Sequence, residues 1–135
     1  MTRLIIYTDG AARGNPGPAG LGVAVCDPDG KVVAELSTYL GELTNNQAEY
    51  RALIAGLEKA LAMGATILNI RADSELMVRQ LNGEYKVKNE GIRPLFEQAK
   101  GLLSRLQRYT INHVPRELNK HADKLANQAI DSAAL

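Results

Sequence analysis

The stretch that decides the fold is residues 3–26, RLIIYTDGAARGNPGPAGLGVAVC, in which two apolar runs flank a connection rich in glycine and proline. The runs Arg3–Thr8 and Leu21–Cys26 have the β-branched and apolar composition of strands. A third such run, Val32–Leu40, follows a turn at Asp27–Gly30. We therefore predict that the chain opens as three consecutive strands joined as a meander.

From Asn45 the apolar period changes from that of a strand to that of a helix, and Gly64 stands where a helix C-cap is expected. The later predicted elements are a strand at Thr66–Ala72, helices at Ser74–Leu81 and Ile92–Gln107, a strand at Tyr109–Val114 and a helix at Asn119–Ile130. Together with these later elements, the order is βββαβααβα. This order predicts an α/β fold with a five-stranded mixed sheet flanked by helices. The irregular stretch Asn82–Gly91 is expected to be a mobile surface loop.

Composition limits what kind of protein this is. With 135 residues and 45% apolar content, residues 1–135 are expected to form a single domain. A net charge of +1 excludes a strong overall field, so any anion-binding surface must be local. The one cysteine, Cys26, lies in an apolar run and is expected to be a buried thiol in a reducing compartment. The sequence shows neither a signal peptide nor a membrane span, so we expect a cytoplasmic monomer with no membrane partner.

Two carboxylates occupy positions that should be covered. Asp9 follows Ile5 and Tyr7 on one face of the first strand, although it could also begin a turn at Asp9–Ala12. Glu49 projects within the apolar arc of its helix, although an acid in the first helical turn could stay wet and be favoured by the helix dipole. A covered carboxylate must be paired, protonated or bound to a cation.

Two further acids stand where a strand ends and where a helix begins. Asp73 follows the fourth strand, where either it or Ser74 could be a helix N-cap. Asp123 lies early in the last helix, where the dipole would also favour an acid at the surface. If all four acids converge, their oxygen atoms form the kind of site that Mg²⁺ or Mn²⁺ requires. Two such ions can activate water and stabilise both oxygens of an in-line displacement at phosphate.

Four motifs resemble, in the same order, those of the type 1 ribonuclease H family. They are YTDGAARGNPG at 7–17, TNNQAE at 44–49, ADS at 72–74 and VPRELNKHADKLAN at 114–127. The resemblance spans nearly the whole chain and implies the ribonuclease H fold. It further implies an endonuclease that hydrolyses the RNA strand of RNA/DNA hybrids by two-metal-ion catalysis, leaving 3′-hydroxyl and 5′-phosphate ends with little sequence preference.

The resemblance also implies roles for individual residues. Asp9, Glu49, Asp73 and Asp123 take the positions of the catalytic, metal-binding carboxylates, with Mg²⁺ as the cofactor and Mn²⁺ as a substitute. Asn15, Asn45 and Asn46 take positions that touch the minor groove of the hybrid, and Thr44 lies next to the phosphate-contacting position. Such contacts distinguish RNA from DNA through the 2′-hydroxyl and the groove shape.

Three departures from the family pattern stand out. Where many members have a loop histidine before the last helix, this chain has Pro115–Leu118, and Arg116 is the candidate substitute. Arg116 cannot be a general base because guanidinium stays protonated, but it can hold phosphate. The stretch Asn82–Gly91 is too short for the basic handle of many relatives. Glu75 sits near a position where relatives often have a neutral polar residue, and it could weaken groove contact or perturb metal binding.

The remaining basic and imidazole side chains have less defined roles. Without a handle, hybrid affinity could rest on Lys86, Lys88, Arg93 and the loop around Arg13, although these could also be ordinary solvated surface. For His113 and His121, predicted in the last strand and in the first turn of the last helix, a structural role is favoured.

Three other functions fit the sequence less well. A non-catalytic hybrid-binding module is disfavoured by the presence of all four acids. An integrase-like strand transferase is disfavoured because the chain has no room for extra DNA-binding segments. The glycine-rich Gly14–Gly17 lacks the Gly-Lys-Ser/Thr ending of a phosphate-binding loop, so a turn is the better interpretation.

Overall fold

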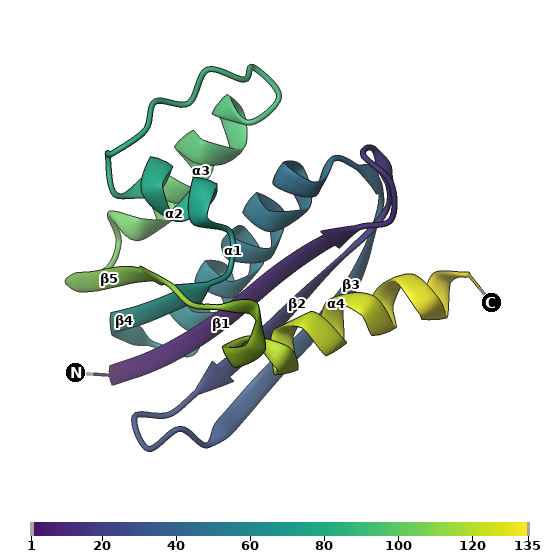
Figure 1. The fold of residues 1–135 in the computed structure, drawn as a ribbon. Helices are drawn as coiled ribbons and strands as arrows, with labels where there is room; N and C mark the ends of the chain where they lie inside the picture. Colours follow the sequence, from purple (N-terminus) through teal and green to yellow (C-terminus); the bar gives the residue numbers. More distant parts are fainter. Residues whose placement is uncertain (1, 135) are drawn as a thin grey trace.

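The structure is a computed structural model that describes residues 2–134. The predicted order of elements is confirmed, with one short 3₁₀ turn added before the last helix (Figure 1). The elements are β1 (Thr2–Ala12), β2 (Gly17–Cys26), β3 (Val32–Leu43), α1 (Asn45–Ala62), β4 (Ala65–Ala72), α2 (Glu75–Leu81), α3 (Arg93–Leu103), β5 (Arg108–His113), η1 (Arg116–Leu118) and α4 (Lys120–Ala133).

The five strands form one mixed sheet in the order β3-β2-β1-β4-β5. The meander β1–β3 is antiparallel, whereas β4 and β5 run parallel to β1 because helices connect them. β1 is therefore central, with an antiparallel neighbour on one side and a parallel neighbour on the other. The predicted five-stranded mixed sheet is confirmed.

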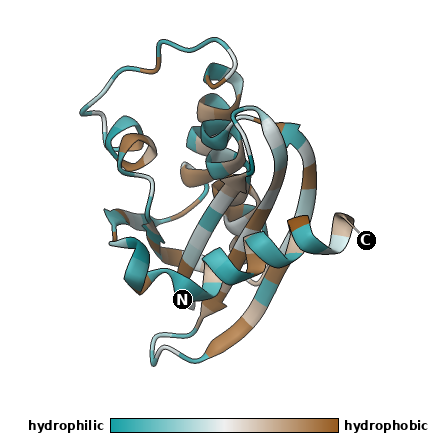
Figure 2. Cartoon of the chain, turned by 45° about the vertical axis from the view of Figure 1, so that its right-hand side comes forward, coloured by the Kyte–Doolittle hydropathy of each residue, from teal (hydrophilic) through white to brown (hydrophobic). Residues whose placement is uncertain are grey.

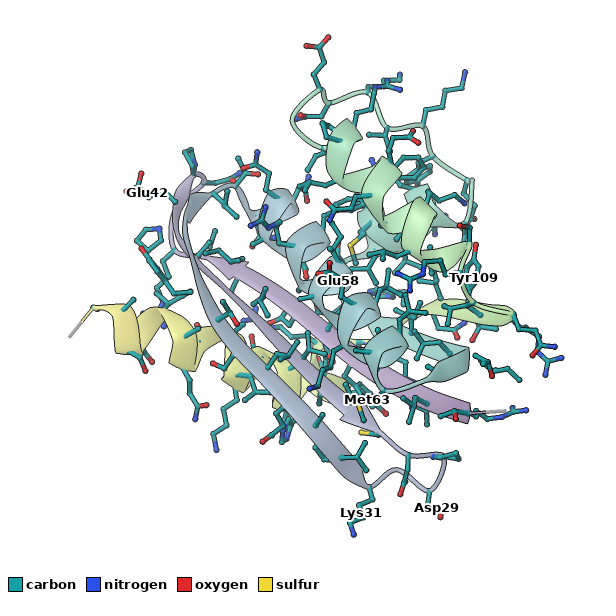
Figure 3. The ribbon with its side chains drawn as sticks, turned by 180° about the vertical axis from the view of Figure 1, so that it is seen from behind. Asp29, Lys31, Glu42, Glu58, Met63 and Tyr109 are labelled. Atoms are coloured by element: carbon teal, nitrogen blue, oxygen red, sulfur yellow. The ribbon has the colours of Figure 1, made fainter. Side chains whose placement is uncertain are left out.

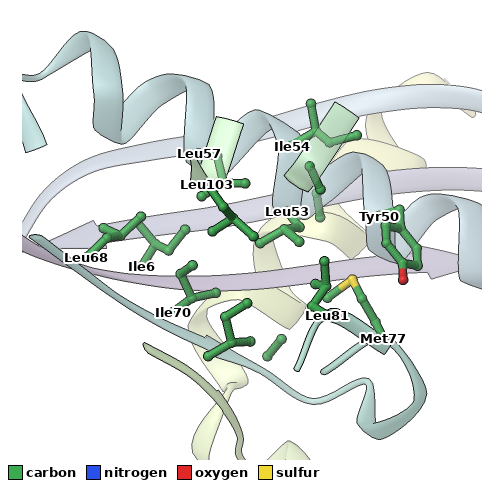
Figure 4. Packing of buried hydrophobic residues seen from close by; sticks show 14 of the residues in the cluster. Ile6, Tyr50, Leu53, Ile54, Leu57, Leu68, Ile70, Met77, Leu81 and Leu103 are labelled. Carbon is green, nitrogen blue, oxygen red and sulfur yellow. The ribbon is translucent and has the colours of Figure 1, made fainter. Parts of the chain in front are cut away.

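Helices lie on both faces of the sheet. α1 covers one face, with α3 packed against it, and α4 crosses β2 and its neighbours on the other face, as the opposite views of Figures 1 and 3 show. The core lies between α1 and the sheet, where Ile6, Leu53, Leu57 and Ile70 are fully buried (Figure 4). Figure 2 shows that the strands carry much of the apolar sequence and that the visible surface of α4 is mostly hydrophilic.

Small residues let both of the main helices approach the backbone of the sheet closely. A Cβ atom added at Gly10 of β1 would lie 2.1 Å from the carbonyl oxygen of Ala48 in α1. A Cβ atom added at Gly22 of β2 would lie 2.0 Å from the carbonyl oxygen of Ala122 in α4. Gly10 therefore sets the distance between β1 and α1, and Gly22 sets the distance between β2 and α4.

Several element boundaries differ from those predicted. β1 continues past Thr8 to Ala12 because its antiparallel ladder with β2 continues to the pair Ala12 and Ala19, so Asp9 lies inside the strand rather than at its end. α3 ends at Leu103 rather than Gln107, since the Gln107 N–H donates to the Thr66 carbonyl at the start of β4.

Both ends of α1 agree with their sequence signals. Thr44 is the N-cap of a capping box with Gln47, and Gly64 follows the C-cap with a φ of 89° that favours glycine. The stretch Asn82–Gly91 contains no helix or strand, as predicted, but Val87 within it is buried in the core. Its predicted mobility stays a prediction.

We predict that Gly22→Ala destabilises the protein by about 1–3 kcal/mol or more, because the added methyl group overlaps the backbone of α4. The matched control is Gly101→Ala in α3, where an added Cβ meets nothing within 4 Å and helix propensity favours alanine. Urea unfolding of both variants tests this prediction. Equal stability of Gly22→Ala and the parent would contradict the close packing of α4 on β2.

Candidate active site

Three carboxylates from separate elements meet at one end of the sheet. Asp9 of β1, Glu49 of α1 and Asp73, directly after β4, each offer an oxygen atom within 4.8 Å of the others. Asp9 and Glu49 are each only 5% exposed, and Asp73 is partly buried. The structure thus brings together three of the four acids that the sequence singles out.

The parallel pairing of β1 with β4 places two of these acids side by side. Thr8 lies opposite Ala72 in the ladder, so the next residues, Asp9 and Asp73, leave the same edge together. Ser74 caps α2 by accepting a hydrogen bond from the Met77 N–H. The alternative in which Asp73 is itself the N-cap is therefore wrong.

Glu49 approaches the pair from α1. Because α1 begins at Asn45, Glu49 lies beyond its first turn, and the interpretation as a wet first-turn acid is wrong. Its Oε1 accepts a hydrogen bond of 2.8 Å from the Gly10 N–H. This bond fixes the carboxylate of Glu49 against the residue that follows Asp9.

Asp123 reaches the site from the first turn of α4. Its carboxyl group contacts that of Asp9, but it lies outside the tight group of three. The side chain of Arg116, which is 77% exposed, reaches back to Asp123 at 3.4 Å. Asp123 is also an acid in the first turn of α4, where the helix dipole favours it. This position is compatible with its place beside the other acids.

Asn119 is a buried residue that the sequence analysis did not single out. The side-chain Nδ2 of Asn119 donates to the backbone carbonyl oxygen of Thr8 at 2.9 Å. The backbone carbonyl oxygen of Asn119 accepts from the Asp123 N–H. Asn119 therefore ties the start of α4 to the strand residue before Asp9. In the sequence, the only sign of a role for Asn119 is its position one helical turn before Asp123.

Burial and mutual repulsion disfavour the charged forms of these acids. Burial, then the negative charge of Glu49, then that of Asp73, raise the pKa of Asp9 far above its usual range. Burial raises the pKa of Glu49 to about 8, with the Gly10 N–H opposing this shift and Asp73 adding to it. Asp9 and Glu49 therefore hold protons that a bound cation would displace.

The arrangement fits a divalent metal ion. Several carboxylate oxygens within reach of one another are the ligands that Mg²⁺ and Mn²⁺ prefer. Among the described residues, the only salt bridge to any of the four acids is that of Arg116 to Asp123. Within residues 2–134 the three central acids thus form no salt bridge with a basic side chain, and a bound cation would supply positive charge in direct contact with them.

The acids line an open hollow of about 440 Å³ whose rim carries Arg13, Asn127 and Arg116. Arg13 in the turn between β1 and β2 is held by Asn127 at 3.1 Å and by Asp131 at 2.6 Å, both on α4. One of the predicted hybrid-binding cations therefore borders the acidic site, although Asp131 partly neutralises it.

A second hollow, of about 350 Å³, is lined by all four residues predicted to contact substrate. Asn15, Thr44, Asn45 and Asn46 line it together with Asn89, which the sequence analysis did not assign a role. The Oδ1 of Asn15 accepts from the Asn45 N–H, and the Oδ1 of Asn89 accepts from the Gly91 N–H. Both amides therefore keep their NH₂ groups available as donors.

The remaining sequence candidates lie away from the acids. His121 contacts Glu35 of β3, which agrees with the favoured structural role, and His113 ends β5 as an exposed residue. Glu75 pairs with Arg79 one turn later at 3.8 Å and is not part of the carboxylate group, so perturbation of metal binding by Glu75 is disfavoured.

Comparison with known proteins agrees with this geometry. A family model described as reverse transcriptase-like matches residues 7–129. Ribonuclease HI of Halobacterium salinarum is 45% identical over 131 residues, which cover 97% of this chain and 66% of that protein. The chain belongs to the ribonuclease H family.

Solved ribonuclease H structures share the fold over nearly its whole length. The Halobacterium salinarum enzyme superposes with a TM-score of 0.94 at 45% identity, covering 96% of this chain and 98% of the other. LC11-RNase H1, solved in complex with an RNA/DNA hybrid, gives a TM-score of 0.93 at 45% identity, with 98% and 99% covered.

Some relatives in the family are longer. The bifunctional protein Rv2228c of Mycobacterium tuberculosis is 47% identical over 133 residues, which cover 98% of this chain but only 36% of that protein. The chain therefore spans about a third of the length of this relative. None of the helices within residues 2–134 is both long and apolar enough to cross a membrane.

We predict that the metal-free protein loses stability as the pH rises. The folded state holds the Glu49 proton more tightly than the unfolded chain, so stability is complete below the ordinary value of 4.5 and is lost as the pH rises through about 8. Folding of the parent at pH 8 also requires Asp9 to take up a proton, because its pKa is raised in the folded state. Asp9→Asn removes this cost and should raise the Tm of the metal-free protein at pH 8 but not near pH 4. Thermal unfolding in chelator measures this difference.

The same experiment tests the fit to a metal ion. Added Mg²⁺ or Mn²⁺ should raise the Tm of the parent more than that of Asp9→Asn, because only the parent keeps the full ligand set. Asp29→Asn, in the exposed turn between β2 and β3, is the matched control and should behave like the parent. Parallel Tm curves for the parent and Asp9→Asn at every pH would refute the prediction.

Proposed function

We propose that this protein is a metal-dependent endoribonuclease that hydrolyses the RNA strand of RNA/DNA hybrids with little sequence preference. The observation that carries the proposal is the convergence of Asp9, Glu49 and Asp73 within shared-ion reach in a chain of the ribonuclease H family. The hybrid complex of the related LC11-RNase H1 supports the substrate class.

The proposed cofactor is Mg²⁺, with Mn²⁺ as a substitute, held by Asp9, Glu49, Asp73 and Asp123. When bound, a pair of these ions supplies an activated water and stabilises the attacking and leaving oxygens of phosphoryl displacement, so that products carry 3′-hydroxyl and 5′-phosphate ends. The chain's own contribution is to hold the carboxylates. The Gly10 N–H fixes Glu49, and Asn119 fixes the start of the helix that carries Asp123.

The polar hollow beside the acids is the proposed hybrid contact. Asn15, Thr44, Asn45 and Asn46 offer amide and hydroxyl groups without net charge, which suits recognition of a groove and of sugar hydroxyls by shape and hydrogen bonding. We add Asn89 to this set because its free amide lies in the same hollow. Backbone and sugar contacts of this kind do not read bases, so cleavage should depend little on sequence.

Arg116 is the proposed phosphate contact at the other side of the acids. It borders the acidic hollow, and its positive charge opposes the rise in the pKa of Glu49. A guanidinium can hold a phosphate oxygen but cannot accept a proton at neutral pH. We further propose that the protein acts as a monomer in the cytoplasm, a reducing compartment in which its buried free thiol, Cys26, is stable.

We predict that the protein cleaves a labelled RNA/DNA hybrid with Mg²⁺ or Mn²⁺ but not with chelator, and that it leaves duplex DNA intact. Asp9→Asn should lower the rate by at least about a thousandfold while folding and hybrid binding are kept, because it removes a metal ligand rather than a substrate contact. Asp29→Asn is the control variant. Metal-dependent binding without cleavage by the parent would show a binding module instead.

We predict that Arg116→Ala lowers kcat/KM for the hybrid about tenfold to a hundredfold, as expected for the loss of a charge-assisted phosphate contact. Arg116→Lys should recover part of the rate because it restores the charge without the planar fork. The metal-induced rise in Tm should be unchanged in both variants. A wild-type rate for Arg116→Ala would remove this residue from the reaction.

A further inference from the structure

One part of the sheet is left uncovered beside the acidic site. α4 packs on β2 and its neighbours β1 and β3, so the same face of β4 and β5 remains open. Side chains there form a shallow hollow of about 340 Å³, which we call the open sheet face. Its defining residues are Arg3, Ile5, Asn69, Arg71, Arg108 and Thr110.

The open sheet face is basic in a protein with almost no net charge. Its lining includes three arginines and no carboxylate, while the whole chain carries only +1. Arg3 and Arg108 are exposed and form no salt bridge within the described residues. The face therefore complements a polyanion.

Arg71 is held in place on this face. Its Nη1 donates to the Tyr7 hydroxyl at 2.5 Å, its Nε donates to Asn69 Oδ1 at 2.9 Å, and its guanidinium lies 5.3 Å from the centre of the Tyr7 ring. Because two of its groups are already bonded, little side-chain entropy is lost when the remaining donors bind an anion.

The strand register places the open sheet face and the acids on the same face of the sheet, where the connection from Val114 to Asn119 crosses from beside Ala72 to beside Thr8 (Figure 1). Arg3, Ile67 and Arg108 form one row across β1, β4 and β5, and Tyr7 pairs with Arg71 two rows further on. The next row on the same face is that of Asp9 and Asp73, since side chains alternate with a period of two. At about 6.6 Å per row, the path from Arg3 to Asp9 is about 20 Å long.

We propose that the open sheet face binds single-stranded RNA that continues from the strand held at the carboxylates. This inference rests on the proposed function, because it extends the cleaved strand beyond the hybrid. The fixed Arg71 and the exposed Arg3 and Arg108 lie beside apolar Ile5. This combination suits a phosphate backbone with its sugars and bases, as in other grooves for single strands. The face would let the enzyme grip hybrids whose RNA strand extends past the DNA.

The test compares a short blunt RNA/DNA hybrid with the same hybrid carrying a single-stranded RNA extension at its 5′ or its 3′ end. Affinities are measured in an Asp9→Asn background so that no RNA is cut. One of the two extensions should tighten binding about tenfold, which is what one or two stacked bases or neutralised phosphates supply. The position of the favoured extension gives the direction of the strand.

The decisive variant is Arg3→Gln combined with Arg108→Gln. It should abolish the gain from the extension and reduce the salt slope of that gain by about 1.4, at about 0.7 per phosphate contact, while affinity for the blunt hybrid is unchanged. The matched control is Lys59→Gln with Lys100→Gln, which removes the same charge from α1 and α3 on the opposite face. The control should keep the gain.

Several outcomes would overturn the proposal. They are an extension without effect, a gain that survives the arginine variant, and an equal loss in the lysine control. Competition by a polyglutamate peptide as strong as that by oligouridine would assign the face to an acidic protein segment instead. Failure of the parent to cleave the blunt hybrid would count against the proposed function, which is thereby tested separately.

Discussion

The structure depends on one electrostatic constraint, which is that three carboxylates lie within 4.8 Å of one another at the end of a parallel strand pair. Asp9 lies in β1 and Asp73 follows β4 directly, so the hydrogen-bonded pairing of these two strands brings the two acids together. The third is held by a backbone N–H donated from the strand. Like charges in a covered position oppose folding, so the sheet and α1 must supply the free energy that keeps them together.

The contacts that maintain this arrangement are made by small side chains and backbone groups. Glycines at positions 10 and 22 let α1 and α4 lie against the strands, and no larger side chain could fit between them. Asn119 adds a buried hydrogen bond that fixes α4 relative to β1. The positions of Glu49 and Asp123 are therefore set by the close approach of backbone segments rather than by contacts between long side chains.

The sequence predicted the order of elements and the sheet type because apolar periodicity changes clearly between strand and helix. It predicted the ends of elements less well. β1 continues through Asp9 because its ladder with β2 continues, and no local residue preference reveals that pairing. Glu49 was correctly expected to be covered, since its position in the apolar arc is a local property. The roles of Asn119 and Asn89 depend on contacts with distant segments, such as the bond from Asn119 to Thr8, and short-range patterns carry no information about these.

Charge is distributed along the sheet in a way that bears on how a polyanion can bind. The acidic hollow lies between a neutral, amide-lined hollow on one side and the basic open sheet face on another. A phosphate backbone that spans these surfaces must cross the acids, which repel it while they are charged and uncompensated. Arg116 and Arg13 offset this only in part, since each is already engaged with an aspartate. A divalent cation at the acids would therefore lower the barrier between two otherwise favourable surfaces, so that the ion proposed for hydrolysis would also favour binding of the strand across the site.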